Sequence, residues 1–381
     1  MKKICYITTR TGTINVFFSS QIYFLSKNGF DITIIATKSR KLDEKLTNSS
    51  NIHFIEVEIP RGISVARTLK CIYEIKKIIH KNKFDLVQYS TPNAAFCSSI
   101  AAKLENIKIR NYHLMGYRYI SYRGIKKIIM KLIEKFTCLL STDIECVSVG
   151  NMNFGITEKI FNQNKVTVVA NGSSGGVDTD KFDISKREKW RKKIRKELNI
   201  EDKEFVFGFI GRITSDKGIN EIITAFKNLK YPAKLILLGQ TEGIQTLNPE
   251  LWSWAKSNTD VIVHSPVDNV EEYYAAIDIL LLPSYREGFG NVIIEAASVG
   301  TLSIVSDIPG PKEIIGNIGG SICVPRDPIS LLEKMESIMK EKNICSYNLA
   351  KCTQELYGSH MLNKKILQRK LSLLKNEGVY K

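Results

Sequence analysis

The sequence predicts an α/β protein made of two domains, each with a parallel β-sheet covered by helices. Two series of short apolar segments alternate with helical patterns, which is the arrangement typical of parallel sheets. A stretch rich in turn residues, Asn171-Gly-Ser-Ser-Gly-Gly176, separates the two series. The chain of 381 residues is long enough for two domains of ordinary size, and its 43% hydrophobic share is typical of a folded protein.

In the first half, seven segments are expected to form strands, and helical patterns at 18–27, 65–81 and 94–103 lie between them. The expected strands are Ile4–Thr8, Ile32–Ala36, His53–Val57, Leu86–Tyr89, Ile109–Leu114, Asp143–Val147 and Lys165–Val169.

The second half repeats this rhythm with six expected strands. They are Phe205–Ile210, Ala233–Leu238, Val261–His264, Ile279–Leu282, Leu302–Val305 and Ser321–Val324. The two series predict two Rossmann-like halves that face a cleft, with ligands bound where the loops gather at the carboxyl ends of the strands.

The charge is unevenly distributed along the chain. Residues 1–178 contain 26 Lys and Arg against 13 Asp and Glu, whereas residues 179–381 contain 29 against 26. A basic first half predicts an anionic partner, either nucleic acid or an anionic membrane surface.

No apolar run approaches the roughly 18 residues that a membrane helix needs, and the eight cysteines form no Cys-x-x-Cys pair. We therefore expect a cytoplasmic protein with reduced thiols.

The most informative segment is Pro283-Ser-Tyr-Arg-Glu-Gly-Phe-Gly-Asn-Val-Ile-Ile-Glu295. Glu287 and Glu295 flank a glycine loop between an expected strand and an expected helix. Such a loop directs backbone N–H groups and the positive helix end toward an anion. Two carboxylates beside that anion suit the hydroxyls of a sugar or a ribose, so the segment predicts a nucleotide-sugar site.

A second segment, Phe207-Gly-Phe-Ile-Gly-Arg-Ile-Thr-Ser-Asp-Lys-Gly218, lies upstream. Arg212 is expected to end a strand and Lys217 to open the next helix, so that both reach one point above the sheet edge. Two fixed cations there would stabilise a diphosphate leaving group as its charge grows. An ordinary pair of surface charges is the alternative interpretation of these two residues.

The two segments together resemble the hallmarks of retaining glycosyltransferases of family 4, which have the GT-B fold, and the resemblance extends from Lys3 to about Leu374. It implies an acceptor-binding domain at 1–176, completed by a returning C-terminal helix at 360–381, and a nucleotide-sugar-binding domain at 177–359. It also implies that Glu295 binds the ribose and Glu287 the donor sugar. The donor diphosphate and sugar would lie against Gly211, Arg212, Lys217, Gly288, Phe289, Gly290, Asn291 and Val292. Apart from the resemblance, Gly12 in the loop after the first expected strand either lets the backbone approach the donor diphosphate or the acceptor, or is a plain turn glycine.

The resemblance further implies transfer without a metal or other cofactor, from a donor that is favoured to be a uridine diphosphate sugar. Asp178-Thr179-Asp180 offers a competing metal motif, but it matches the family's Gly-Val-Asp-x-x-x-Phe segment, which Phe182 completes. On the acceptor side, Asn111-Tyr-His-Leu-Met-Gly-Tyr-Arg-Tyr119 resembles a family stretch that lines the active site. His113 is either a core histidine or an active-site residue, and Arg118 matches relatives that use lipid diphosphate acceptors.

The segment 123–136 combines apolar residues at helical spacing with Lys126, Lys127, Lys131 and Lys135. It predicts an amphipathic basic helix that contacts an anionic membrane, although a helix packed on the core with a solvated lysine face would show the same pattern.

The expected function is therefore sugar transfer to a polyprenyl-diphosphate-linked glycan at the inner face of a bacterial plasma membrane, in surface-polysaccharide biosynthesis such as capsule or O-antigen. A nucleotide-sugar epimerase of the same fold and a nucleic-acid binder are the alternatives. The second lacks support because no basic patch is interleaved with stacking aromatic residues, so we expect no nucleic-acid partner.

Overall fold

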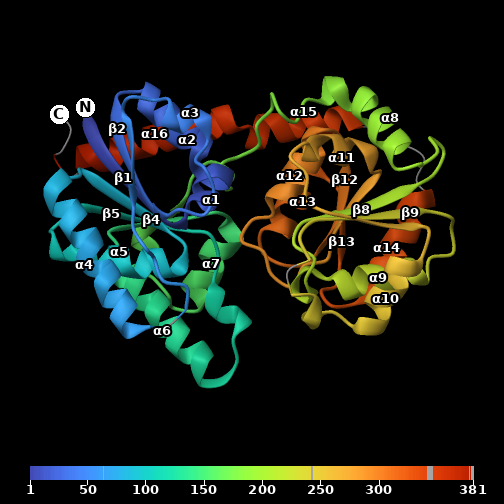
Figure 1. Cartoon of the computed structure of the whole chain (residues 1–381), viewed down its shortest axis with the longest axis horizontal. Coiled ribbons are helices and arrows are strands. Elements are labelled where there is room, and N and C mark those ends of the chain that lie inside the picture. The colour runs from blue at the N-terminus through green and yellow to red at the C-terminus, as the bar shows by residue number, and fades with distance from the viewer. Residues whose placement is uncertain (63, 242, 341–345, 377, 379–381) are drawn as a thin grey trace. The chain divides into compact units, whose positions relative to one another are not determined.

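The computed structural model describes residues 1–62, 64–241, 243–340, 346–376 and 378 (Figure 1). The chain divides into two compact units. The first comprises Met1–Gly175 and Ser359–Lys381, and the second comprises Gly176–Gly358. These bounds lie within one residue of the expected domain limits.

The first unit contains a seven-stranded parallel sheet of order β3-β2-β1-β4-β5-β6-β7. Every expected strand of the first half forms. The strands are β1 (Lys2–Arg10), β2 (Phe30–Thr37), β3 (Ile52–Glu56), β4 (Leu86–Ser90), β5 (Ile109–Leu114), β6 (Asp143–Cys146) and β7 (Val166–Val168).

Helices cover both faces of this sheet because both faces of its strands are apolar. In β1, Cys5 and Ile7 belong to the core under α4, α5 and α6, whereas Ile4 and Tyr6 belong to the core under α2 and α16. This alternation is the two-residue period of a strand. The helices are α1 (Thr11–Thr13), η1 (Ile14–Phe18), α2 (Ser19–Lys27), α3 (Glu44–Thr47), α4 (Val65–Asn82), α5 (Pro92–Leu104), η2 (Arg118–Ser121), α6 (Gly124–Leu140), α7 (Val149–Thr157), η3 (Gln163–Lys165) and α16 (Ser359–Asn376).

The second unit contains a six-stranded parallel sheet of order β10-β9-β8-β11-β12-β13. The strands are β8 (Val206–Ile210), β9 (Lys234–Leu238), β10 (Val261–His264), β11 (Ile279–Leu282), β12 (Leu302–Ser306) and β13 (Ser321–Cys323). The helices are η4 (Ile184–Lys186), α8 (Arg187–Glu197), η5 (Ser215–Lys217), α9 (Ile219–Lys227), η6 (Ile244–Thr246), α10 (Pro249–Ser257), α11 (Val270–Ala276), α12 (Asn291–Ser298), α13 (Pro311–Ile318), α14 (Pro328–Lys340) and α15 (Ser346–Tyr357).

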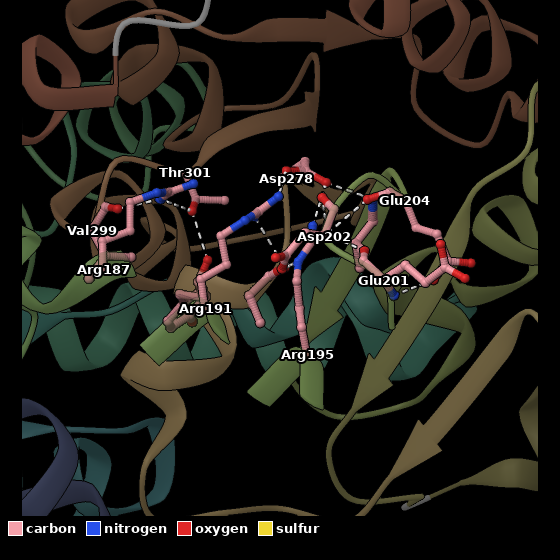
Figure 2. A network of polar contacts seen from close by, with 12 residues as sticks. Arg187, Arg191, Arg195, Glu201, Asp202, Glu204, Asp278, Val299 and Thr301 are labelled. Atoms are coloured by element: carbon pink, nitrogen blue, oxygen red, sulfur yellow. Dashed lines mark hydrogen bonds and ion pairs between the residues drawn. The ribbon is translucent and has the colours of Figure 1, made fainter. Parts of the chain in front are cut away.

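A buried arginine network fixes α8 at the amino-terminal edge of this second sheet (Figure 2). Arg195 donates to the carboxylate of Asp278 at 2.9 Å and to the carbonyl oxygens of Ala276, Glu201, Asp202 and Glu204. Asp278 also accepts from the backbone N–H of Val206. Because the guanidinium is buried, these bonds replace the water that it loses on folding. The candidate functional residues lie at the opposite, carboxyl-terminal edge of this sheet.

Among the described residues, no helix is long and apolar enough to cross a bilayer.

Candidate active site

Two loops meet at the carboxyl-terminal edge of the second sheet. One follows β8 and leads to α9, and the other follows β11 and leads to α12. Gly218, which precedes α9, has a φ of 75°, and a Cβ at this position would lie 2.3 Å from the carbonyl oxygen of Pro283. Only glycine permits this backbone approach, so Gly218 holds the two expected motifs together.

Lys217 and Glu287 form an ion pair across these loops. The Lys217 Nζ atom lies 2.6 Å from Glu287 Oε1, and the side chains are 18% and 14% exposed. Lys217 lies in the short turn η5 rather than opening a helix as expected, because the left-handed Gly218 delays α9 to Ile219. The structure thus brings one residue of each motif into direct contact.

Asp216 lies among the neighbouring cations and was not predicted from the sequence. Its carboxylate accepts a 2.5 Å hydrogen bond from Thr214 and lies 3.1 Å from Arg286 Nη2. Partial burial opposes the charge of Asp216, but the Thr214 hydroxyl and the cations Arg286, Arg212 and Lys217 keep its pKa below the ordinary value. Arg212 itself is exposed just beyond β8 and Gly211.

The glycine loop ends at the amino terminus of α12. Gly290 precedes the helix with a φ of 105°, and the half-buried Asn291 and Val292 form its first positions. Phe289 is buried and meets the Tyr357 ring edge-on at a centroid distance of 5.7 Å, which fixes the loop that also carries Gly288. The positive end of α12 therefore points out of the same sheet edge as Lys217.

Glu295 lies one turn further into α12, where its carboxylate accepts a 2.8 Å hydrogen bond from the hydroxyl of Tyr274. Removal from water raises the pKa of Glu295, although Tyr274 and Lys181 partly offset the effect. A hollow of about 410 Å³ opens at the ends of β9 and β10 and is lined by residues 239–241 and 263–266.

The Asp178-Thr179-Asp180 segment, which offered a competing metal motif, forms a turn. Asp178 accepts hydrogen bonds from the backbone N–H groups of Asp180 and Lys181, as turn aspartates do.

His113, in the first unit, is a buried histidine. Its Nε2 atom lies 3.0 Å from Ser174 Oγ, its Nδ1 atom lies 3.6 Å from Glu145, and its ring contacts Phe18 edge-on. The His113 ring therefore packs within the core of the first unit, at the end of β5.

Glu145 also pairs with the fully buried Lys370 of α16, at 2.9 Å. Burial disfavours the carboxylate, but Lys370 and His113 outweigh it and lower the pKa of Glu145. This pairing ties the returning helix to the first sheet.

Gly12 lies in α1, and its N–H donates to Ser39 Oγ at 3.3 Å. A Cβ at this position would make only an ordinary 3.6 Å contact, so the local geometry does not require glycine. Arg118 lies at the start of η2, where it donates to Asn93 and lines a hollow of about 350 Å³.

The helix α6 carries the four lysines predicted to contact a membrane. Lys126 and Lys127 are exposed, Lys131 pairs with Glu158 at 2.6 Å, and Lys135 is half-buried. One face of α6 packs on the core through Met130, Ile133 and Cys138, but most of its apolar residues do not. The apolar residues that remain exposed are Ile125, Ile128, Ile129, Leu132, Phe136 and Leu139.

Comparison with known proteins agrees with this architecture. Residues 3–148 match the family model described as glycosyl transferase 4-like, and residues 191–351 match that of glycosyl transferases group 1. A capsular polysaccharide biosynthesis glycosyltransferase of Staphylococcus aureus is 29% identical over 347 residues, which cover 90% of this chain and 89% of the relative.

The UDP-Gal:α-D-GlcNAc-diphosphoundecaprenol α-1,3-galactosyltransferase of Escherichia coli is 25% identical over 353 residues, covering 90% of this chain and 88% of that relative. Sucrose-phosphate synthase from Thermosynechococcus elongatus has the same fold, with a TM-score of 0.80 at 16% identity over 99% of this chain and 100% of that one. The chain is therefore a glycosyltransferase with the GT-B fold, in which a glycosyl transferase 4-like domain precedes a glycosyl transferases group 1 domain.

Proposed function

We propose that the protein transfers a sugar, with retention of anomeric configuration, from a uridine diphosphate sugar to a polyprenyl-diphosphate-linked glycan in bacterial surface-polysaccharide biosynthesis. The observation that carries the proposal is the Lys217–Glu287 pair at the edge of the second sheet, beside the amino terminus of α12. One cation, one carboxylate and one helix end suit a diphosphate joined to a hydroxylated sugar.

In this mechanism the bond between the anomeric carbon and the diphosphate oxygen breaks, and its electron pair stays on the diphosphate. Lys217 and Arg212 stabilise the growing negative charge, and the first turn of α12 adds its positive dipole. Glu287 accepts from a donor-sugar hydroxyl, while Glu295 accepts from the ribose. The acceptor hydroxyl attacks on the face that the diphosphate leaves, and its proton passes to the departing phosphate oxygen.

The positive charge at the diphosphate comes from the protein in this proposal, so no divalent metal is needed. Asp216 acts as a positioning residue, because it lies near Arg286, Arg212 and Lys217 and orients these cations without touching the donor. The Escherichia coli relative uses a UDP-sugar donor and a diphosphoundecaprenol-linked acceptor, as its name states, and this supports the same classes here.

Contact with a membrane is part of the proposal, because a polyprenyl-linked acceptor is held in the bilayer. Support comes from α6, which exposes Ile125, Ile128 and Leu132 beside Lys126 and Lys127. A helix with an exposed apolar stripe and flanking lysines binds at the surface of anionic lipid. The protein would then act as a peripheral enzyme on the cytoplasmic face.

The experiment that tests the chemistry measures transfer in excess chelator and determines the anomeric configuration of the product by NMR. We expect full activity, the same anomer in donor and product, and a loss in turnover on the order of 100-fold for Arg212→Ala. Activity that disappears with chelator and returns with manganese would show that the two-cation mechanism is wrong.

A further inference from the structure

An apolar cavity of about 530 Å³ lies in the first unit, between α4, α5 and α6. Leu69 and Ile72 line it from α4, Phe96 and Ile100 from α5, and Met130 and Ile133 from α6. Its volume is within the range of pockets that bury most of a small ligand. The donor chemistry proposed above uses none of these residues.

The cavity adjoins the hollow at the carboxyl ends of β1 and β4, and the two share Pro92, Asn93 and Arg118. The nine residues that line this hollow include Arg10, Arg61 and Arg118 and no carboxylate. Arginine forks bind diphosphate oxygens in pairs, so the hollow suits a dianionic group. The apolar cavity thus adjoins the arginine-lined hollow at Arg118.

The backbone beside the hollow is held in an unusual conformation. Thr91, the residue between β4 and α5, has a φ of 66°, which a β-branched residue rarely adopts. Its hydroxyl accepts from the backbone N–H of Thr9 at 3.1 Å, and this bond ties the end of β4 to the end of β1. Strained residues that neighbouring contacts hold in place cluster at ligand sites.

We propose that the cavity holds the isoprene units nearest the diphosphate of a polyprenyl diphosphate, and that the arginine hollow holds the diphosphate. This inference rests on the proposed function for the class of acceptor, and it adds where the lipid binds. The charges match, because three arginines face a group with at least two negative charges. The apolar lining matches a hydrocarbon chain, which has no hydrogen-bonding groups to satisfy.

The surroundings of the cavity also fit a long chain that continues into a bilayer. Val65 and Leu69 line the cavity and are 72% and 61% exposed, and α6 exposes Ile129 and Leu132. The residues that would meet the membrane therefore lie on the same helices as the cavity walls. A chain longer than the cavity could leave it across an apolar surface.

The test is calorimetric binding of farnesyl diphosphate to the full chain in saturating uridine diphosphate, which occupies the proposed donor site, with inorganic diphosphate and farnesol as separate arms. Each buried methylene multiplies affinity roughly fourfold, so we expect farnesyl diphosphate to bind at least tenfold more tightly than inorganic diphosphate. Leu69→Glu should weaken farnesyl diphosphate at least tenfold and leave inorganic diphosphate unchanged. Leu104→Glu is the matched control, since Leu104 is 57% exposed and lies outside the cavity lining.

Arg118→Gln should weaken both diphosphates and spare farnesol, whereas Arg123→Gln, outside both linings, should change neither. If Leu69→Glu lowers the melting temperature, Thr68→Trp fills the cavity without adding a charge and should give the same loss. Equal binding of farnesyl and inorganic diphosphate, or equal effects of Leu69→Glu and Leu104→Glu, would overturn the inference.

Sugar transfer to a polyprenyl-diphosphate-linked acceptor, measured separately, distinguishes the two proposals. If transfer occurs but Leu69→Glu does not alter farnesyl diphosphate binding, the proposed function stands and the cavity assignment is wrong. If the cavity binds farnesyl diphosphate as predicted but no lipid-linked acceptor receives sugar, the cavity assignment stands and the proposed acceptor is wrong.

Discussion

Replacing Glu134 by Gln should stabilise the first unit at neutral pH. Glu134 is buried on the inner face of α6, where its carboxyl group accepts a 2.7 Å hydrogen bond from the hydroxyl of Tyr112 on β5. Burial raises the pKa of Glu134 from 4.5 to about 7, although the hydrogen bond from Tyr112 partly opposes this shift. Gln keeps the hydrogen-bond acceptor and carries no charge at any pH.

The sign follows from which state binds the proton more tightly. Below pH 4.5 both the folded and the unfolded chain keep Glu134 protonated, so the wild type loses nothing there. Between pH 4.5 and about 7 the unfolded chain releases the proton while the folded chain retains it, and stability falls. The difference of about 2.5 pH units corresponds to roughly 3 kcal/mol, which Glu134→Gln should recover by pH 8.

Urea unfolding at pH 4 and pH 8, followed by circular dichroism, measures this difference. All three tryptophans (Trp190, Trp252 and Trp254) belong to the second unit, so their fluorescence reports that unit separately. Glu44→Gln is the control, because this carboxylate is 78% exposed in the same unit as Glu134. An equal effect of Glu134→Gln at the two pH values, or a gain at pH 4 that disappears at pH 8, would refute the reasoning.

Two further predictions concern binding. Glu295→Gln should mainly raise KM for the donor, because Glu295 is assigned to the ribose, and Glu287→Gln should mainly lower kcat, because Glu287 is assigned to the reacting sugar. Steady-state kinetics measure both. Equal rises in KM for the two variants with kcat unchanged would contradict the assignment. Replacing the four α6 lysines by Gln should reduce co-sedimentation with anionic vesicles at low salt and leave nucleotide affinity intact, because exposed charges attract the lipid surface within about 8 Å. The matched control replaces four lysines of α8. If the wild-type protein does not co-sediment with anionic vesicles at low salt, α6 does not dock on the membrane. The two sets are Lys126, Lys127, Lys131 and Lys135 on α6, and Lys189, Lys192, Lys193 and Lys196 on α8, and each set contains one lysine in a 2.6 Å ion pair.

Much of the fold was predictable because parallel strands buried on both faces are continuous apolar runs. The segments Ile109–Leu114, Val261–His264 and Ile279–Leu282 form strands with the expected limits. The loops were harder, because hydrophobic periodicity does not report backbone torsions. The left-handed Gly218 places Lys217 in a turn before α9, where it can reach Glu287.

The candidate site was predictable only where a motif marked it. Glu287 and Lys217 lie 70 residues apart, and their motifs indicated that both face one ligand. Arg10, Arg61 and Asn93 come from the end of β1, the segment before α4 and the first turn of α5, and no motif joins them. Lys370 did carry a signal, since it follows Leu362 and Ile366 at four-residue spacing on an otherwise apolar stripe. A lysine at such a position predicts a buried acidic partner, which Glu145 supplies.

The central claim is that Lys217 and its neighbours activate a UDP-sugar for transfer to a lipid-linked acceptor. The most direct measurement is the transfer of radiolabelled sugar from a panel of UDP-sugars to an undecaprenyl-diphosphate-linked acceptor, with lipid-extractable label counted for the wild type and Lys217→Met. We expect label in the lipid fraction for the wild type and on the order of 100-fold less for the variant, because a transition-state cation is lost. Absence of lipid-extractable label with every UDP-sugar, or equal label from both proteins, would contradict the account.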